Sequence, residues 1–189
     1  MSRLPPADEK NDSELAAVFA ELRASRGWVS NALCSMGHAP EALRRFASLG
    51  DYVRYHTRLP DRMREIVIIT TGRGTPYAVG HHAPLGLQAG LTKAEIDSLL
   101  AGTVPPTFGD ADAVVVRYVL EFTSGKPVTD GTFQALRAVM SPREITDVTM
   151  TSVYFVTLAM VITTMGVELE SEEHLYAERD WQRKKNQGK

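Results

Sequence analysis

The sequence predicts an all-α fold, and three observations support it. Apolar residues recur at intervals of three and four along most of the chain, which is the spacing of one helix face. Two segments, Thr92 to Glu95 and Ser141 to Glu144, have the Ser/Thr-x-x-Glu pattern of a helix capping box. No turn of the Asn-Gly type joins alternating apolar and polar runs, so no β-hairpin is indicated.

The composition is that of one ordinary globular domain. The chain has 189 residues, 43% of them apolar and 23% charged, with 21 Lys and Arg against 23 Asp and Glu. A net charge of -2 provides no basic surface for nucleic acid or for an anionic membrane. A single cysteine, Cys34, rules out an intramolecular disulfide. Because the sequence starts without a charged and apolar leader, we expect the protein in the cytoplasm.

The N-terminal part is predicted to hold a loose arm and three helices. Residues 1–12 contain two prolines and mixed charge without a period, which indicates a flexible arm. Ser13 is a suitable N-cap for the first helix. Further helices fit residues 29–36, which end before Gly37, and residues 40–56.

The middle of the chain is ambiguous between helix and strand at one place. A helix can begin at Pro60 or Asp61, although the β-branched residues of segment 66–70 are also compatible with a strand. The next helix fits residues 75–89, with Gly90 in the left-handed position that ends a helix.

The C-terminal half is predicted to be helical as far as residue 181. Both capping boxes open helices, and the second has proline at the first helical position. The expected helices cover residues 92–100, 110–122 and 129–140, a long helix from residue 142 that contains an uncharged stretch, and 171–181. Residues 13–181 are therefore predicted to form one domain, followed by a basic C-terminal tail at residues 182–189.

The uncharged stretch, residues 148–167, has the length that a bilayer span requires. Six hydroxyl residues and Gly166 make its transfer into lipid unfavourable, so we predict a buried helix and no membrane contact. A helix that is apolar on nearly every side must be covered by protein. In a chain of this size, a neighbouring subunit is the expected cover.

The densest group of polar residues, which carries the candidate chemistry, comprises Glu65, Arg73, Tyr77, His81 and His82. Glu65 begins a strongly apolar run, so its carboxylate is either drawn into the interior or held in the first helical turn by the helix dipole. Tyr77 and His81 are four residues apart and share a helix face. His81 and His82 point about 100° apart, so we predict no metal site and expect one ring inside and the other outside. A neutral imidazole facing a cavity can move a proton near pH 7, whereas a buried structural histidine is the alternative.

Three segments in this order resemble the carboxymuconolactone decarboxylase and alkylhydroperoxidase D superfamily: LPDRMREIVII at residues 59–69, YAVGHH at 77–82 and AGLTKAEI at 89–96. The similarity extends over residues 28–170. It implies an alkylhydroperoxidase D-like helical bundle that assembles as a homo-oligomer, a trimer or a hexamer, with an active pocket near subunit contacts.

The resemblance argues against dithiol peroxidase activity. In the peroxidase branch, a Cys-x-x-Cys pair lies seven and four residues before the histidine, and those positions are Thr75 and Ala78 in this chain. Peroxide reduction by that route requires one thiol to attack and a second to resolve the sulfenic acid. Cys34 is far away in the sequence and is interpreted as a small buried apolar residue.

The decarboxylase branch is similar in lacking the thiol pair while keeping the histidine. The resemblance makes His82 the proton carrier and Glu65 the residue that orients it, without a cofactor. Arg73, Tyr77 and His81 are then candidate substrate-binding residues. Glu65 and His82 are 17 positions apart, two fewer than expected for the family, and that difference puts their contact in question.

The prediction is a cofactor-independent enzyme of lyase or isomerase type, which transfers a proton on a small carboxylated or lactone-like substrate. A non-catalytic oligomer that binds a small ligand with the same residues is the alternative from a different class. A sealed core around His82 would favour a third possibility, a structural or assembly protein.

Overall fold

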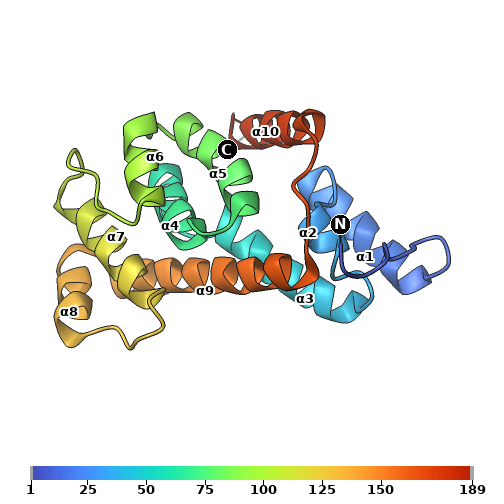
Figure 1. Cartoon of the computed structure of the whole chain (residues 1–189), viewed down its shortest axis with the longest axis horizontal. Coiled ribbons are helices and arrows are strands. Elements are labelled where there is room, and N and C mark those ends of the chain that lie inside the picture. Colours follow the sequence, from blue (N-terminus) through green and yellow to red (C-terminus); the bar gives the residue numbers. More distant parts are fainter. Residues whose placement is uncertain (1, 188–189) are drawn as a thin grey trace. The chain divides into compact units, whose positions relative to one another are not determined.

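The computed structural model describes residues 2–187, and every regular element in this range is an α-helix, as predicted (Figure 1). In chain order the helices are α1 (Ser13–Arg26), α2 (Asn31–Cys34), α3 (Pro40–Tyr55), α4 (Asp61–Gly72), α5 (Pro76–Gln88), α6 (Lys93–Leu100), α7 (Asp110–Phe122), α8 (Asp130–Val139), α9 (Pro142–Met165) and α10 (Glu172–Gln187).

The chain divides into two compact units. Unit 1 contains the residues up to Asp51 and from Met160 onward, and unit 2 contains Tyr52–Ala159. Unit 1 therefore holds α1, α2, α10 and most of α3, whereas unit 2 holds α4 to α8 and most of α9. All the site residues selected from the sequence lie in unit 2.

The core of unit 1 forms where α1, α2 and α3 pack together. Its buried members are Leu15, Val18, Phe19, Leu22, Leu33, Leu43 and Ala47. The cap of α1 is Asp12 rather than Ser13, since the Asp12 side chain accepts hydrogen bonds from the first backbone N–H groups of the helix. Residues 2–12 contain no helix, and within this segment the Arg3 N–H donates to the Met165 carbonyl at 2.8 Å.

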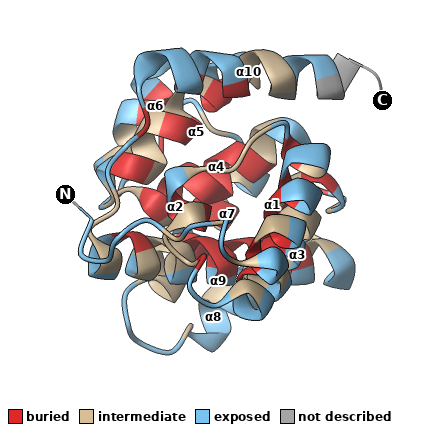
Figure 2. Cartoon of the chain, turned by 90° about the vertical axis from the view of Figure 1, so that its right-hand side faces the viewer, coloured by how far each residue is buried: buried red, intermediate tan, exposed pale blue. Residues whose placement is uncertain are grey.

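Helix α4 is the centre of unit 2. It contacts α5, α6 and α7, and α7 in turn contacts α8. Figure 2 shows α4 as a largely buried helix, and the residues from Arg64 to Thr70 are all buried. One apolar cluster packs Val67 against α7, α8 and α9, while a second packs Ile66 and Ile69 against α6 and α7. A helix surrounded in this way must be apolar on nearly all sides.

This burial explains why segment 66–70 is helical despite its β-branched residues. Ile66, Val67, Ile68 and Ile69 are each at most 3% exposed, so contacts on every side of α4 outweigh their β propensity. The hydroxyl of Thr70 donates to the Ile66 carbonyl at 2.7 Å, which satisfies that polar group within the helix.

Most helix boundaries follow the predicted signals. The Thr92–Glu95 capping box is confirmed, and Ser141 and Glu144 make the corresponding pair of contacts at the start of α9. Gly90 has a φ of 91°, the left-handed conformation predicted for it. Two boundaries differ: α2 is limited to Asn31–Cys34, and α10 continues to Gln187, through part of the segment predicted as a basic tail.

By length and composition, α9 is the one helix of residues 2–187 that could cross a membrane, and 33% of its most apolar 18-residue window is buried. Its Thr149, Thr151 and Ser152 hydroxyls donate to carbonyls four residues earlier, so these polar groups are satisfied inside the helix. A stripe of uncharged residues remains exposed or half-exposed, at spacings of three and four: Thr146, Met150, Val153, Thr157, Met160 and Thr164. This set is called the α9 stripe below.

Candidate active site

Adjacent helices of unit 2 bring Glu65 and His82 together. Glu65 lies in the first half of α4 and His82 in the middle of α5, and the two helices pack against each other. The Nδ1 atom of His82 lies 2.9 Å from Oε2 of Glu65, a hydrogen-bonding distance. Both residues are buried, at 5% and 7% exposure. The shorter spacing between the two positions therefore preserves their contact.

Small residues allow α4 and α5 to come this close. A Cβ atom built on Gly86 would lie 2.8 Å from Cδ1 of Ile69, and one built on Gly72 would lie 2.7 Å from Cβ of Ala78. Gly86 is one helical turn beyond His82, and Ile69 is one turn beyond Glu65. The close approach of Gly86 to Ile69 therefore lies one turn from the Glu65–His82 hydrogen bond. It helps to keep α4 and α5 at the separation that this hydrogen bond requires.

The hydrogen bond fixes which ring nitrogen of His82 is available. When Glu65 is ionised, its carboxylate only accepts hydrogen bonds, so in that state Nδ1 is the donor and Nε2 of the neutral ring presents its lone pair. Within residues 2–187, Nε2 makes no hydrogen bond, because the contact of Nδ1 is the ring's only one. Nε2 can accept a proton, and the imidazolium that forms would lie beside a carboxylate that stabilises it.

Two further residues that the sequence did not single out complete the surroundings of the pair. Nε of Arg64, which is buried, lies 3.9 Å from Oε1 of Glu65, and its Nη2 donates to Asp61 at 2.9 Å. Phe155 on α9 meets the His82 ring edge to face, with centroids 5.0 Å apart. Arg64 lies in a segment with three other charged residues at the start of α4, and Phe155 is 73 residues beyond His82, so neither gave a local signal.

Tyr77 and His81 form a second aromatic pair on α5. Their ring centroids are 4.7 Å apart, as the spacing of four residues predicted. The expectation that one histidine points outward is wrong, because His81 and His82 are both 7% exposed. Helix α5 is covered on more than one face, so two rings that point about 100° apart can both be enclosed.

Arg73 is not brought to the Glu65–His82 pair. Its Nη1 donates to the Thr70 carbonyl at 2.8 Å and to the Thr123 hydroxyl at 3.0 Å, at the end of α4. Eight residues separate Arg73 from Glu65, which corresponds to about 12 Å along a helix. In this position Arg73 caps α4 and links it to the end of α7.

Cys34 lies in unit 1, half-buried, with Sγ 3.8 Å from the Val29 carbonyl. Burial raises the pKa of this thiol, which lowers the fraction of the reactive thiolate. Among residues 2–187, no group of three or more His, Cys, Asp or Glu side chains is arranged to hold a metal ion.

Comparison with known families supports the resemblance seen in the sequence. Residues 40–121, which include the Glu65–His82 pair, match the model of the Carboxymuconolactone decarboxylase family. The matched segment, which is less than half of the chain, is similar to that family, and this similarity is consistent with the resemblance to the carboxymuconolactone decarboxylase and alkylhydroperoxidase D-like superfamily. The chain has no Cys-x-x-Cys pair, since it has a single cysteine. No curated protein sequence matches the chain.

Several solved structures share the fold of this chain. An alkylhydroperoxidase AhpD core, an uncharacterised peroxidase-related protein from Ralstonia eutropha JMP134, has a TM-score of 0.75 and 18% identity, covering 90% of this chain and 93% of that one. A peroxidase-related protein from Silicibacter sp. TM1040 has a TM-score of 0.74 and 16% identity, covering 92% and 94%. The debrominase Bmp8, in a variant bound to 2,3,4-tribromopyrrole, has a TM-score of 0.74 and 14% identity, covering 96% and 100%. At these identities the likeness establishes the fold alone.

Proposed function

We propose that the protein is a cofactor-independent lyase of decarboxylase type, in which His82 transfers a proton on a small carboxylated or lactone-like molecule. The observation that carries the proposal is the buried hydrogen bond between Glu65 and Nδ1 of His82, which leaves Nε2 available. A base that is itself held by a third group is the usual arrangement for proton transfer in enzymes. The family description of the matching segment favours the decarboxylase chemistry.

The proposed reaction needs only proton transfer and charge stabilisation. The bond between the carboxylate carbon and the neighbouring carbon breaks, its electron pair moves into a conjugated carbonyl group, and carbon dioxide leaves. The imidazolium form of His82 supplies the proton to the carbon that receives the electrons, and water restores that proton. Glu65 stabilises the imidazolium before the transfer and keeps the ring in place afterwards.

Substrate binding is assigned to the residues around the pair. Arg64 is the buried cation nearest Glu65, so in the proposal it attracts the substrate carboxylate, while the imidazolium of His82 lies beside Glu65. Tyr77 and His81 offer polar groups on the same helix as His82 and are proposed to contact substrate oxygens. Arg73 has no place in the proposal, because its guanidinium is bonded at the other end of α4.

An assay of carboxymuconolactone decarboxylation, in which the release of carbon dioxide is measured, tests the proposal. We expect His82→Gln to lower kcat by about 10²- to 10⁴-fold, the usual contribution of a general acid–base residue. His38→Gln is the matched control, since His38 is exposed and bonded to the Pro5 carbonyl in unit 1. Glu65→Gln is expected to lower kcat more than it changes KM, and to change the solvent deuterium isotope effect, which a purely structural role would not do.

Two outcomes would contradict the proposal. If Cys34→Ser abolished turnover while His82→Gln did not, the chemistry would be that of a thiol. If no carboxylated lactone were turned over, but His82→Gln still weakened the binding of such compounds, the protein would be the non-catalytic ligand-binding oligomer.

A further inference from the structure

Unit 1 contains a cavity of about 320 Å³ that no sequence motif indicated. It lies between the C-terminal end of α1 and one face of α10, where His174, Glu178 and Trp181 follow one another at helical spacing. Small-molecule sites in proteins start at a volume of about 300 Å³, so a single small ring system would fit. None of its lining residues belongs to the Glu65–His82 site.

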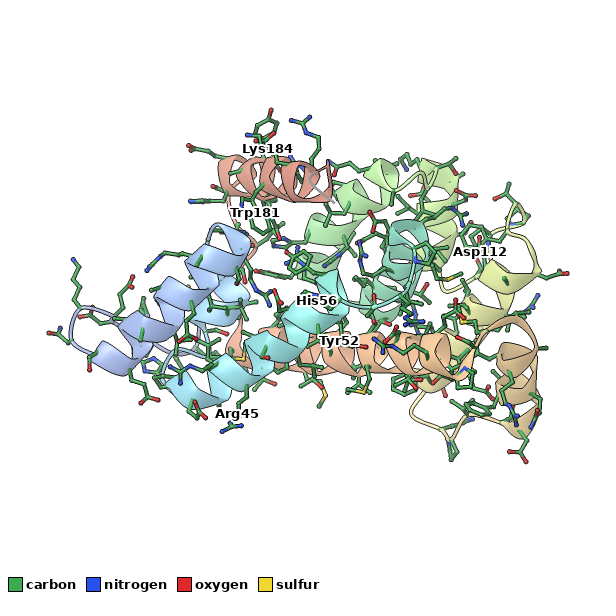
Figure 3. All side chains as sticks on the ribbon, turned by 180° about the vertical axis from the view of Figure 1, so that it is seen from behind. Arg45, Tyr52, His56, Asp112, Trp181 and Lys184 are labelled. Atoms are coloured by element: carbon green, nitrogen blue, oxygen red, sulfur yellow. The ribbon has the colours of Figure 1, made fainter. Side chains whose placement is uncertain are left out.

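The walls of the cavity are aromatic. The rings of Trp28 and His174 are nearly parallel, with 6° between their planes and 6.1 Å between their centroids. Trp181 projects from α10 and is seated against Gly27, where a Cβ atom would lie 2.8 Å from Cδ1 of the indole (Figure 3). Gly27 also has a φ of 82°, a conformation that favours glycine. The backbone at the end of α1 is therefore shaped to accept this indole.

The charged groups of the lining balance one another. Arg26 and Lys184 supply two positive charges, and Glu178 and Asp180 supply two negative charges. Nζ of Lys184 pairs with Asp180 at 2.6 Å, and Nη2 of Arg26 donates to the Ala47 carbonyl at 2.6 Å. A charged ligand would lose hydration on entering without meeting an excess of opposite charge in the lining. The lining therefore favours a ligand without net charge.

We propose that this cavity binds a planar, uncharged heteroaromatic molecule. Its flat faces would stack on the indole and imidazole rings, as aromatic pairs do at centroid distances of about 4.5–7 Å. Its ring nitrogen and oxygen atoms would exchange hydrogen bonds with the charged groups at the edge. The proposal stands independently of the activity assigned to unit 2.

Tryptophan fluorescence reports directly on this cavity, because Trp28 and Trp181 are the only two tryptophans of the chain and both line it. Caffeine, a planar and neutral heteroaromatic compound, serves as the probe. We expect it to change the emission saturably and to bind about tenfold more tightly than cyclohexanol, which cannot stack, a difference of roughly one good stacking contact. It should also bind more tightly than benzoate and benzyltrimethylammonium, which can stack but carry a net charge. Calorimetric titration gives the same affinities without relying on the indoles.

Variants on α10 locate the binding. His174→Ala removes one parallel wall and is expected to weaken caffeine binding severalfold, whereas Ala177→Leu fills the cavity and is expected to abolish it. Ala177 is itself exposed, so the larger side chain is compatible with folding. Tyr176→Ala is the control, because Tyr176 is 65% exposed and does not line the cavity.

Three results would overturn the proposal. The first is the absence of a saturable response to caffeine. The second is an affinity for caffeine that Ala177→Leu leaves unchanged. The third is tighter binding of benzyltrimethylammonium than of caffeine, which would make the cavity an aromatic site for an organic cation.

Discussion

Asp147 on α9 has no exposed surface, yet it holds together three parts of unit 2. Its carboxylate accepts hydrogen bonds from the Tyr52 hydroxyl, from the Arg58 N–H at 2.9 Å and from the Arg143 guanidinium at 3.2 Å. Figure 3 labels Tyr52 in the last turn of α3. Burial alone would raise the pKa of Asp147, but these hydrogen bonds outweigh it and hold the pKa below its usual value.

Asp147→Asn should therefore reduce stability in a pH-dependent way. Asp147 binds its proton more weakly in the folded chain than in the unfolded chain, so its contribution is complete above about pH 4 and is lost as the pH falls further. We expect the substitution to lower the free energy of unfolding by on the order of 2–3 kcal/mol at pH 7. Urea unfolding at several pH values measures this loss, which should shrink toward pH 3. The exposed Asp97→Asn is the control, and equal losses in both variants would contradict the assignment.

Sequence reasoning at the residue scale succeeded where partners share a helix or a known motif. The Tyr77–His81 contact follows from a spacing of four residues. The family resemblance paired Glu65 with His82, the shortened spacing left their contact in question, and the structure shows that contact. Asp147 gave no signal because Tyr52 is 95 positions away from it. Burial of both adjacent histidines could not be derived either, because it depends on which helices cover α5.

Gly86 connects the packing of α4 and α5 to the geometry of the candidate site. A side chain at this position would meet Ile69, Leu91 and Ile96, which belong to one buried cluster. Close packing here keeps the two helices near each other one turn beyond the Glu65–His82 hydrogen bond. The position therefore tests whether helix separation controls that hydrogen bond.

Gly86→Ala is expected to destabilise the protein although alanine favours helices. Overpacking costs about 1–3 kcal/mol, and the gain in helix propensity returns about 1 kcal/mol, so the net loss is about 1 kcal/mol. Gly131→Ala on α8 is the matched control, because nothing lies within 4 Å of a Cβ atom there, and it should be neutral or stabilising. Thermal unfolding compares the two variants. A higher unfolding temperature for Gly86→Ala would contradict this prediction, because it would mean that α4 and α5 leave space for a methyl group.

Most elements were predictable because their start and stop signals are local. The capping boxes of α6 and α9 and the left-handed Gly90 act within a few residues. Segment 66–70 remained ambiguous because β-branched residues suit both a strand and a fully buried helix, and only tertiary packing decides between them. The end of α10 was missed because its last residues carry no apolar repeat.

At the scale of the whole molecule, the α9 stripe is the surface through which copies of this chain are predicted to associate. Its average spacing of 3.6 residues places its members along one face of α9. Met160 is 66% exposed and Val153 is 37% exposed, so the chain leaves apolar surface on α9 uncovered. The homo-oligomer, a trimer or a hexamer, stays a prediction, and α9 is the surface through which we expect it to form.

Met160→Glu should weaken this assembly. A charge placed on the stripe would have to be buried without a partner when two copies meet, which is costly. Light scattering coupled to gel filtration is expected to give the mass of an oligomer for the original chain and a smaller mass for the variant. Tyr176→Glu on α10, a position of nearly equal exposure, should keep the original mass. A monomeric original chain would refute the prediction.

The placement of both tryptophans in unit 1 makes the cooperativity of unfolding visible. Emission follows unit 1 alone, whereas far-ultraviolet circular dichroism follows the helices of both units. Coincident denaturation curves would mean that the two units melt as a single body, and separated curves would reveal an intermediate with one unit intact. Because both tryptophans lie in unit 1, a comparison of fluorescence with circular dichroism shows whether the two units unfold independently.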